Sequence, residues 1–335
     1  MKLRKYKFFY FVILISLFSV LLTSCSRQTN PVTKTGFYFN TVISISLYDS
    51  KDTTLLDDCF SLADSYEKMF SKTVEGSDIW KINHSAGSPV GVTEETAFLL
   101  QKALDYAALT EGVVDPTIGS VSELWNFSEN TTGELPNPQE LEEALTHVNY
   151  KNISISDLDV TLSDKKTKLD LGFIAKGYIA DRMKEYLLSK GVKSALINLG
   201  GNVLVIGEKP DKTPFRLGVQ KPFAPEGTPL TTIPVIDCSV VSSGNYERYF
   251  DKDGKIYHHI LDSKTGYPIW NNLSEVTILS NSSTDGDALS TACFALGLEK
   301  GMALIESLEE IEAIFVETDY TLHYTSGLQN LSELK

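Results

Sequence analysis

The segment with the clearest chemical potential is residues 170–181, which read DLGFIAKGYIAD. Asp170 opens a glycine-bearing turn, and Lys176 adds a positive charge to it. A strand-like run (160–169) precedes the turn and a helix-like run (178–188) follows. That order directs backbone N–H groups towards a phosphate or pyrophosphate. Many Gly-Lys turns only cap a helix, so this segment alone leaves both interpretations open.

A second candidate site lies at the start of a late helix, in residues 285–292 (DGDALSTA). Asp287 and Thr291 are four residues apart and therefore share one helical face. A carboxylate and a hydroxyl directed at one point suit a hard cation such as Mg²⁺. The alternative is that Asp287 caps the helix, near the positive end of its dipole, while Thr291 is only packed.

A third segment could supply a proton-transfer group. Residues 242–248 (SSGNYER) lead through a predicted Asp-Gly hairpin turn at 253–254 to His258 and His259. Histidine is the side chain best suited to exchange protons near neutral pH. On a strand only one of two adjacent residues faces a site, and we predict His259, because it immediately precedes an apolar run. The alternative is a surface pair with no chemical role.

Two glycine-rich segments complete the set. Residues 112–119 (GVVDPTIG) fix the backbone with Gly and Pro around one acid and one hydroxyl, which would allow close approach of a ligand. By itself this stretch is equally an ordinary turn after a helix. Residues 198–202 (NLGGN) place two glycines between apolar runs, which also describes a simple hairpin turn.

The elements that must position these residues mix strands and helices without a regular βαβ alternation. We therefore predict an α+β fold with mixed, largely antiparallel sheets and packed helices. Strands are expected over 41–48, 153–162, 195–199, 202–206, 215–219, 232–241, 257–261, 274–279 and 313–316. Helices are expected over 55–70, 93–110, 135–146, 178–188, 285–296 and 300–308.

The N-terminus has the pattern of a secretory signal. Residues 1–7 carry four cations, residues 8–22 are almost wholly apolar, and Leu-Thr-Ser precedes Cys25. This predicts a signal peptide over 1–24, lipid attachment at Cys25, which resembles a lipobox cysteine, and a polar tether over 25–35. The alternative is an uncleaved anchor helix. Both interpretations place the rest of the chain outside the cytoplasm, at a membrane surface.

Composition excludes some partners. Cleavage would remove four cations and no acid, which takes the net charge from −14 to −18. We therefore expect no binding to nucleic acid or to an anionic bilayer through charge. Three cysteines would remain, Cys59, Cys238 and Cys293. So few, and an odd number, do not indicate a disulfide framework, and each is predicted to be a small buried hydrophobic residue.

Together the five ordered motifs resemble the FAD:protein FMN transferase (ApbE-type) family from about residue 37 to residue 316. The resemblance implies one flavin transferase domain over 36–325, open to division into two interleaved subdomains. It further implies that FAD is split at its pyrophosphate, FMN passes to a Thr or Ser hydroxyl of a target protein, and AMP leaves. The implied partner is a flavoprotein subunit of a membrane redox system, with Thr in a Gly-Ala-Thr-like context.

The resemblance also assigns roles to individual residues. It implies Asp287 and His259 in catalysis, with His259 activating the acceptor. Ligands of Mg²⁺ would be Asp287, Thr291, Ser290 and the backbone carbonyl of Phe173. Contacts to FAD would come from Phe39, Val113, Val114, Asp115, Thr117, Asp170, Lys176, Ser243, Gly244 and Leu261.

The chain departs from the family pattern at several flavin-facing positions. Asn40 stands where Gly is common, Thr73 lies near a position that is often aromatic, and Ser263 replaces a common Pro; Ser242 and Asn245 replace a common Thr and Asp. None of these changes removes a predicted metal or proton-transfer residue, so they bear on flavin affinity more than on reaction class. Two alternatives share the site: a FAD pyrophosphatase that releases FMN and AMP, and a non-catalytic FAD-binding lipoprotein.

Overall fold

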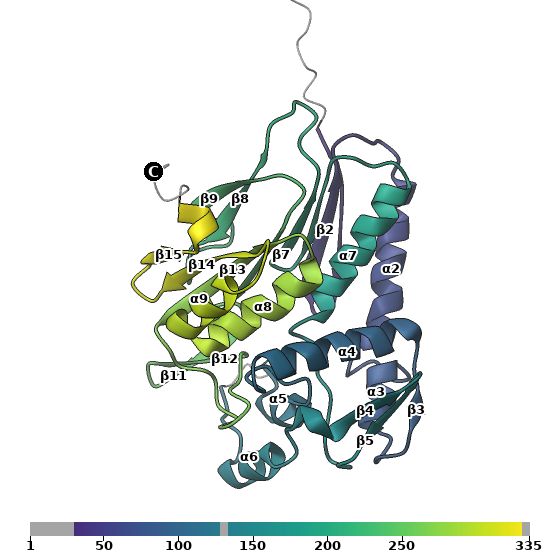
Figure 1. Cartoon of the computed structure of the whole chain (residues 1–335), viewed down its shortest axis with the longest axis vertical. Helices are drawn as coiled ribbons and strands as arrows, with labels where there is room; N and C mark the ends of the chain where they lie inside the picture. The colour runs from purple at the N-terminus through teal and green to yellow at the C-terminus, as the bar shows by residue number, and fades with distance from the viewer. Residues whose placement is uncertain (1–29, 128–132, 330–335) are drawn as a thin grey trace, which may run out of the picture.

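The computed structural model describes residues 30–127 and 133–329 (Figure 1). The predicted signal peptide and Cys25 lie outside the described residues. Within the described ranges, no helix has both the length and the apolar character needed to cross a membrane.

An eight-stranded sheet forms the centre of the fold, with strand order β1-β2-β6-β7-β10-β13-β14-β15. Each neighbouring pair in it is antiparallel, which agrees with the predicted α+β class. The strands are β1 (Val32–Tyr38), β2 (Thr41–Leu47), β6 (Ala195–Leu199), β7 (Asn202–Ile206), β10 (Ser239–Gly244), β13 (Leu273–Ser280), β14 (Glu312–Glu317) and β15 (Leu322–Tyr324).

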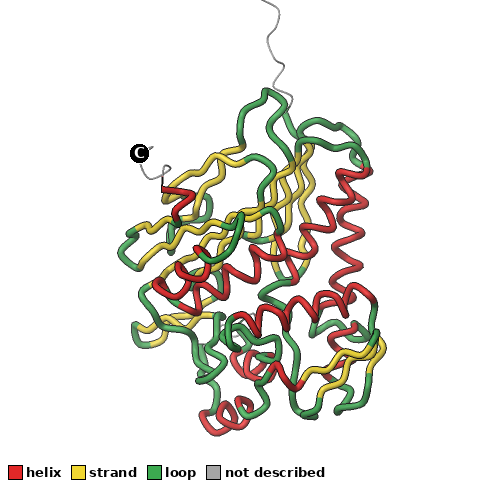
Figure 2. Tube along the Cα trace, in the orientation of Figure 1, coloured by secondary structure: helices red, strands yellow, loops and turns green. Residues whose placement is uncertain are grey.

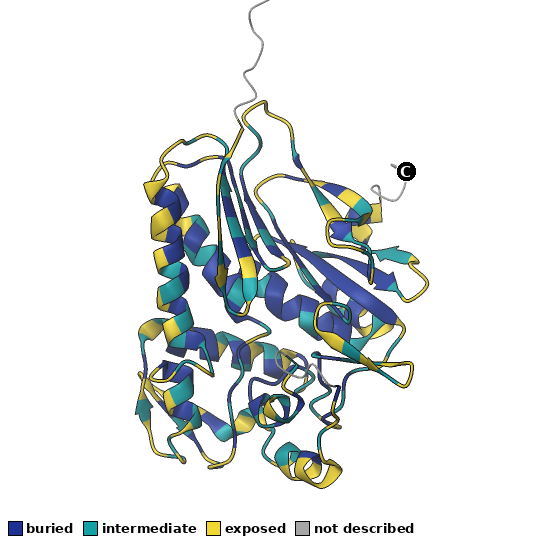
Figure 3. Ribbon diagram, turned by 180° about the vertical axis from the view of Figure 1, so that it is seen from behind, coloured by how far each residue is buried: buried dark blue, intermediate teal, exposed yellow. Residues whose placement is uncertain are grey.

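Helices cover one face of this sheet, and a hairpin covers the other (Figures 1 and 2). Alternate residues of β13 and β14 separate accordingly, since Ile278 and Phe315 pack under helices while Leu279 and Val316 pack under the hairpin. The covering elements are α2 (Thr54–Phe70), α7 (Ala175–Ser189), α8 (Ser283–Leu296), α9 (Leu298–Glu306), β8 (Phe215–Gln220) and β9 (Pro229–Val235). The middle of the sheet is therefore buried on both faces, as Figure 3 shows.

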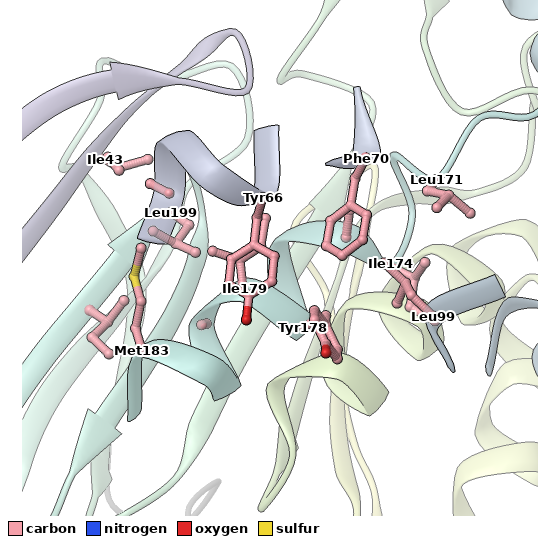
Figure 4. Close-up of a cluster of buried hydrophobic side chains, with 14 of the residues drawn as sticks. Ile43, Tyr66, Phe70, Leu99, Leu171, Ile174, Tyr178, Ile179, Met183 and Leu199 are labelled. Atoms are coloured by element: carbon pink, nitrogen blue, oxygen red, sulfur yellow. The ribbon is translucent and has the colours of Figure 1, made fainter. Parts of the chain in front are cut away.

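The largest core cluster lies between the sheet, α2 and α7. Figure 4 shows Ile43 and Leu199 of the sheet facing the same cluster as Tyr66 of α2 and Met183 of α7. Tyr66 also meets the ring of Tyr178 edge-to-face, with centroids 5.7 Å apart. This packing fixes the direction of α7, and so the position of the Gly-Lys turn at its start.

A second group of elements lies between α2 and α7 in the chain. Trp125 and Leu141 of this group form a small separate core with Leu261 from the later loop after β12, whereas residues such as Leu99 and Val160 belong to the main core cluster. The elements are α3 (Asp78–Asn83), β3 (Val90–Gly91), α4 (Glu94–Leu109), α5 (Gly119–Trp125), α6 (Pro138–Leu145), β4 (Ile153–Ser156) and β5 (Asp159–Leu162), with β11 (Tyr249–Lys252) and β12 (Lys255–His258) adjoining them.

Three strand predictions were wrong in detail. The predicted strand 153–162 is two strands, β4 and β5, because Asp157 adopts a left-handed conformation (φ 53°) in the turn between them. The predicted strand 232–241 is two strands, β9 and β10, because Asp237 adopts a left-handed conformation (φ 44°) between them and its N–H donates to the Gly207 carbonyl. The predicted strand 257–261 ends at His258, and Leu261 only forms an isolated bridge with Pro268. The break at Asp237 depends on its contact with Gly207, which is distant in the sequence.

Helices α7 and α8 cross in close contact at their N-terminal ends. A Cβ atom at Gly177 of α7 would lie 2.1 Å from the Ser283 carbonyl oxygen and 2.8 Å from Asp287 Cβ of α8. The Asp181 carboxylate of α7 accepts the backbone N–H groups of Ser283 (2.8 Å) and Thr284 (2.9 Å). These donors are otherwise unpaired at a helix start, so α7 caps α8.

We predict that Gly177→Ala separates these two helices. The added methyl group would overlap backbone atoms that cannot move alone, and overpacking of this kind costs about 1–3 kcal/mol. Urea denaturation should show that loss relative to the parent chain. The control is Gly91→Ala, whose Cβ would make only an ordinary contact at 3.6 Å; equal stability of the two variants would contradict the crossing.

Candidate active site

Asp287 and Lys176 bring the two predicted chemical segments together. Asp287 is only 2% exposed. One carboxylate oxygen lies 3.1 Å from Lys176 Nζ, and the other accepts the Gly177 backbone N–H at 2.9 Å. The start of α8 and the Gly-Lys turn of α7 therefore meet at one carboxylate, although Lys176 and Asp287 are 111 residues apart in the chain.

Three hydroxyl groups form a cluster between β10 and the first half of α8. Ser243 Oγ on β10 is 2.8 Å from Ser290 Oγ and 3.2 Å from Thr291 Oγ1 on α8. Ser290 Oγ also donates to the Asp287 carbonyl oxygen at 2.9 Å, and the residue is fully buried. Thr291 remains partly exposed. Ser290 thus joins helix to strand, while Thr291 is the hydroxyl open to a ligand.

The oxygen atoms here fit a hard cation better than a soft one. In the part of the chain that the structure describes, no backbone N–H donates to the Phe173 carbonyl, because that of Gly177 donates to Asp287 instead. Asp287, Thr291 and this carbonyl would offer one charged and two neutral oxygens, the ligand type of Mg²⁺. Across the described ranges there is no cluster of three or more His, Cys, Asp or Glu side chains suited to a metal.

Asp115 and Thr117 hold their own loop together. Asp115 Oδ1 accepts the Thr117 backbone N–H at 2.8 Å and Oδ2 accepts the Tyr150 N–H at 2.9 Å, while Thr117 Oγ1 accepts the Asn149 N–H at 2.8 Å. Burial raises the pKa of Asp115, although these hydrogen bonds oppose the shift. Both side chains are turned inward, so contact with FAD at this loop would fall to its backbone and to the partly exposed Val113.

Asp170 is also engaged inside the protein. Its carboxylate contacts Lys72 Nζ at 2.7 Å, accepts the Ser122 hydroxyl at 3.0 Å and accepts the Gly172 N–H at 2.9 Å. Burial acts to raise the pKa of Asp170, but the Lys72 charge and the hydrogen bonds outweigh it and lower the pKa to about 2. The Asp170 backbone N–H donates to the Pro116 carbonyl, which ties the FAD-loop candidate to the Gly-Lys turn.

The two adjacent histidines face different surroundings. His258 is buried, donates from Nε2 to the Ile269 carbonyl at 2.8 Å and meets the Phe294 ring edge-to-face. His259 is half-buried, its backbone N–H donates to the Arg248 carbonyl, and among the described residues its Nδ1 atom has no hydrogen-bond partner. Of the two rings, that of His259 therefore has a buried nitrogen without a partner among the described residues, and its role in proton transfer stays a prediction.

Burial, helped by nearby positive charges, keeps the His259 ring neutral at physiological pH. Burial is the main cause that lowers its pKa to about 3, and the positive charges of Arg248 and Lys176 add to the shift. Lys176 therefore lies close enough to act on both Asp287 and the histidine. A neutral imidazole has a lone pair free to accept a proton.

Glu247 was not among the predicted site residues. Although the residue keeps an exposed surface, desolvation by the surrounding protein raises its pKa to about 7; Lys176 opposes this shift, and the charges of Glu275 and Asp287 add to it. Glu247 therefore lies near the same Lys176 that contacts Asp287. The only sequence signal was its position in the stretch SSGNYER (242–248), which also contains the predicted contacts Ser243 and Gly244.

The remaining predicted FAD contacts are packed within the fold. Phe39 has a left-handed backbone (φ 52°) and packs against the main core, and Val114 and Leu261 are buried. A Cβ atom at Gly244 would lie 2.5 Å from the Tyr246 ring, which explains the glycine by packing alone. Their roles towards FAD stay predictions.

Two surface hollows in the described structure lie elsewhere, with volumes of about 550 and 360 Å³. One is lined by residues of β15 and the turn before it, and the other by α5, α6 and the loop before Leu169. Neither lining includes a predicted site residue, so neither changes the location of the candidate site.

Comparison with known proteins establishes the family of the chain. The model of the ApbE family matches residues 39–315. The chain belongs to the ApbE family. The FAD:protein FMN transferase of Klebsiella pneumoniae is 38% identical over 82% of this chain and 85% of its own, and that of Treponema pallidum is 35% identical over 82% and 80%.

Solved structures of ApbE proteins also share the fold. The ApbE protein of Thermotoga maritima superposes with a TM-score of 0.82 at 33% identity, covering 90% of this chain and 98% of its own. The flavin transferase ApbE of Vibrio cholerae gives a TM-score of 0.78 at 26% identity, with the same coverage. Each of the five motif segments, from residue 112 to residue 292, lies within the range that the family model matches.

The Asp170–Lys72 pair predicts a specific acid sensitivity. The folded pKa of Asp170 lies below its ordinary value, so its stabilisation is complete above about pH 4 and is lost as pH falls towards 2. The loss amounts to about 2 kcal/mol. Lys72→Met should remove this part of the pH dependence in urea denaturation between pH 5 and 2. The control is Lys68→Met, which breaks an exposed pair; identical acid profiles would refute the assignment.

Proposed function

We propose that this chain transfers the FMN part of FAD to a Thr or Ser hydroxyl of a target flavoprotein and releases AMP. The observation that carries the proposal is the meeting of the Gly-Lys turn and the Asp-x-x-x-Thr helix start at Asp287. Relatives named FAD:protein FMN transferase, which cover most of the chain, support the same reaction. In it the hydroxyl oxygen bonds to the FMN phosphorus, the bond to the AMP oxygen breaks, and the hydroxyl proton passes to a base.

A divalent cation fits this proposal. Mg²⁺ would be held by Asp287, Thr291 and the Phe173 carbonyl, and it would supply charge neutralisation to the pyrophosphate. The Asp287 carboxylate holds the Lys176 ammonium group in place and balances its charge. From this position the ammonium group could also bind an anionic phosphate. The site thus offers positive charge to a phosphate that is being transferred. When no anion is bound, Lys176 compensates the charge of Asp287.

The proton of the acceptor hydroxyl would go to His259. Its ring is neutral at pH 7 and Nδ1 has no partner among the described residues, so no other hydrogen bond competes for it. Glu247 shares the neighbouring Lys176 with His259 and is a second carboxyl group near this end of the site. Positioned general bases contribute about 10²–10⁴-fold to rate, most when their pKa lies near the working pH.

The place of action is proposed from the N-terminal sequence. A basic start, an apolar run and Leu-Thr-Ser before Cys25 support export and lipid attachment. Strand β1 begins at Val32, seven residues after Cys25. Even fully extended, seven residues span at most about 25 Å, so the domain would stay close to the membrane and to the flavoprotein subunits of membrane redox systems that we propose as acceptors.

The direct test is mass spectrometry of a purified extracytoplasmic flavoprotein subunit after incubation with this chain, FAD and Mg²⁺. A mass gain equal to FMN on a Thr or Ser supports transfer. Release of FMN and AMP without any labelled protein would instead identify a pyrophosphatase. Tight FAD binding with no turnover at any Mg²⁺ concentration would identify a binding protein.

We predict that Asp287→Asn lowers the rate of FMN transfer at least 100-fold. Asparagine can still accept the Gly177 N–H, so the fold should survive, but the charge that orders Lys176 and the cation is lost. Labelling is followed by acceptor mass, and folding by circular dichroism. Glu299→Ala, at the exposed start of α9, is the control. Undiminished labelling by Asp287→Asn would count against the proposed site.

We predict that His259→Gln lowers the transfer rate about 100-fold and leaves the KM for FAD unchanged, because a proton acceptor is removed but no nucleotide contact. The rate is measured with saturating acceptor. His84→Gln, an exposed histidine stacked on Trp80, is the control. If both variants transferred FMN at the parent rate, His259 would have no part in proton transfer.

A further inference from the structure

An exposed phenylalanine in the loop between β8 and β9 has no role in the core. Phe223 is 46% exposed, and its backbone adopts a left-handed conformation with φ 60°. For a bulky residue other than glycine this conformation is rare and costs conformational free energy. Strain at an exposed side chain that adds little to the core indicates a functional reason for the residue.

The loop that carries Phe223 is braced from inside. The Gln220 side-chain amide donates to the carbonyls of Lys221 (3.0 Å) and Pro225 (3.1 Å), and its oxygen accepts the Gly227 N–H at 2.9 Å. From outside, the Lys221 ammonium lies 4.8 Å from the centroid of the Tyr320 ring. The loop therefore holds its shape before any partner binds.

Phe223 forms an aromatic platform with two tyrosines. Its ring meets that of Tyr249 edge-to-face at 5.3 Å and that of Tyr246 at 6.1 Å. Tyr249 is 44% exposed, whereas the Tyr246 hydroxyl donates to the buried carboxylate of Glu275 at 2.9 Å. Tyr246 is thus the fixed base of the platform, and the edges of Phe223 and Tyr249 are open to solvent.

The platform adjoins the proton-transfer histidine. Tyr249 directly follows Arg248, whose carbonyl accepts the His259 N–H. Tyr249 also pairs with His258 across the β11–β12 hairpin. Whatever protein brings a hydroxyl to His259 must therefore lie over or beside this end of the hairpin.

We propose that Phe223, with Tyr249, is the docking contact for the acceptor protein, and that it binds an apolar side chain near the acceptor hydroxyl. This rests on the proposed function. A protein acceptor must cover far more than one hydroxyl, since a stable interface buries about 800 Å² on each partner. Rigid aromatic side chains dominate binding energy at such interfaces, and a braced loop loses little entropy on binding.

The left-handed backbone allows a sharp test. Phe223→Gly and Phe223→Asn both suit φ 60°, so each removes the ring without straining the loop. With the acceptor subunit used for mass spectrometry, we expect the KM for that protein to rise at least about 10-fold. Tyr249→Ala should raise it in the same direction, and Phe223→Trp should restore the parent value. FAD cleavage without acceptor and the KM for FAD should stay unchanged.

The control is Leu188→Ala, which removes a side chain of similar exposure (47%) near the far end of α7. An unchanged KM for the acceptor in Phe223→Gly would overturn the proposal. So would a raised KM for FAD, which would assign the ring to the nucleotide, or a lower molar mass than that of the parent chain in sedimentation, which would assign the ring to contact with a second copy. Failure of the parent chain to label any acceptor would instead reject the proposed function, and this docking contact with it.

Discussion

The reciprocal capping of α7 and α8 is the interaction on which the rest of the site depends. Asp287 of α8 accepts a backbone N–H from the first turn of α7, and Asp181 of α7 accepts two from the first turn of α8. Each helix start thus has a carboxylate at its positive end. The contact is possible only because Gly177 has no side chain. It places the buried Asp287 carboxylate where the starts of two helices and Lys176 meet. The carboxylate can bind a cation there, and the helix starts and the lysine can bind an anion.

Two separate ion pairs then divide the charge around the Gly-Lys turn. Asp170 is compensated by Lys72, and Asp287 by Lys176. The first pair is supported by further hydrogen bonds and joins the α2–α3 connection to the turn, so its effect is structural. The second has only one Lys contact at 3.1 Å, and the same lysine acts on Glu247 and His259. Breaking a buried ion pair leaves an uncompensated charge. Movement of the Lys176 ammonium group from Asp287 to a phosphate is therefore favourable only when another cation takes its place at Asp287.

Sequence patterns marked the two segments that meet at Asp287, but not the residues that surround them. Local spacing was enough to place Asp287 and Thr291 on one helical face and to prefer His259 over its neighbour. Lys72 could not be predicted, because 98 residues separate it from Asp170 and no motif marks it. Asp115 was recognisable as a fixed acid, but whether its carboxylate faces a ligand or its own loop depends on Tyr150, which only the fold brings near. The α+β class followed from the mixed pattern, whereas the ends of the strands depended on tertiary turns such as that at Asp237.

One continuous segment, residues 242–249, connects the proposed nucleotide side of the site to the proposed acceptor side. In β10 the alternation of side chains sends Ser243 towards α8 and Ser242 towards Thr277 on the opposite face. Beyond Gly244 the Tyr246 ring folds back onto the strand, which turns the chain so that Glu247 and Arg248 come near Lys176 and His259. Because one backbone holds the hydroxyl cluster, the proton-transfer surroundings and the aromatic platform, a shift at either end would displace the other. Rigid coupling of this kind suits a reaction in which two large substrates must meet at one phosphorus atom.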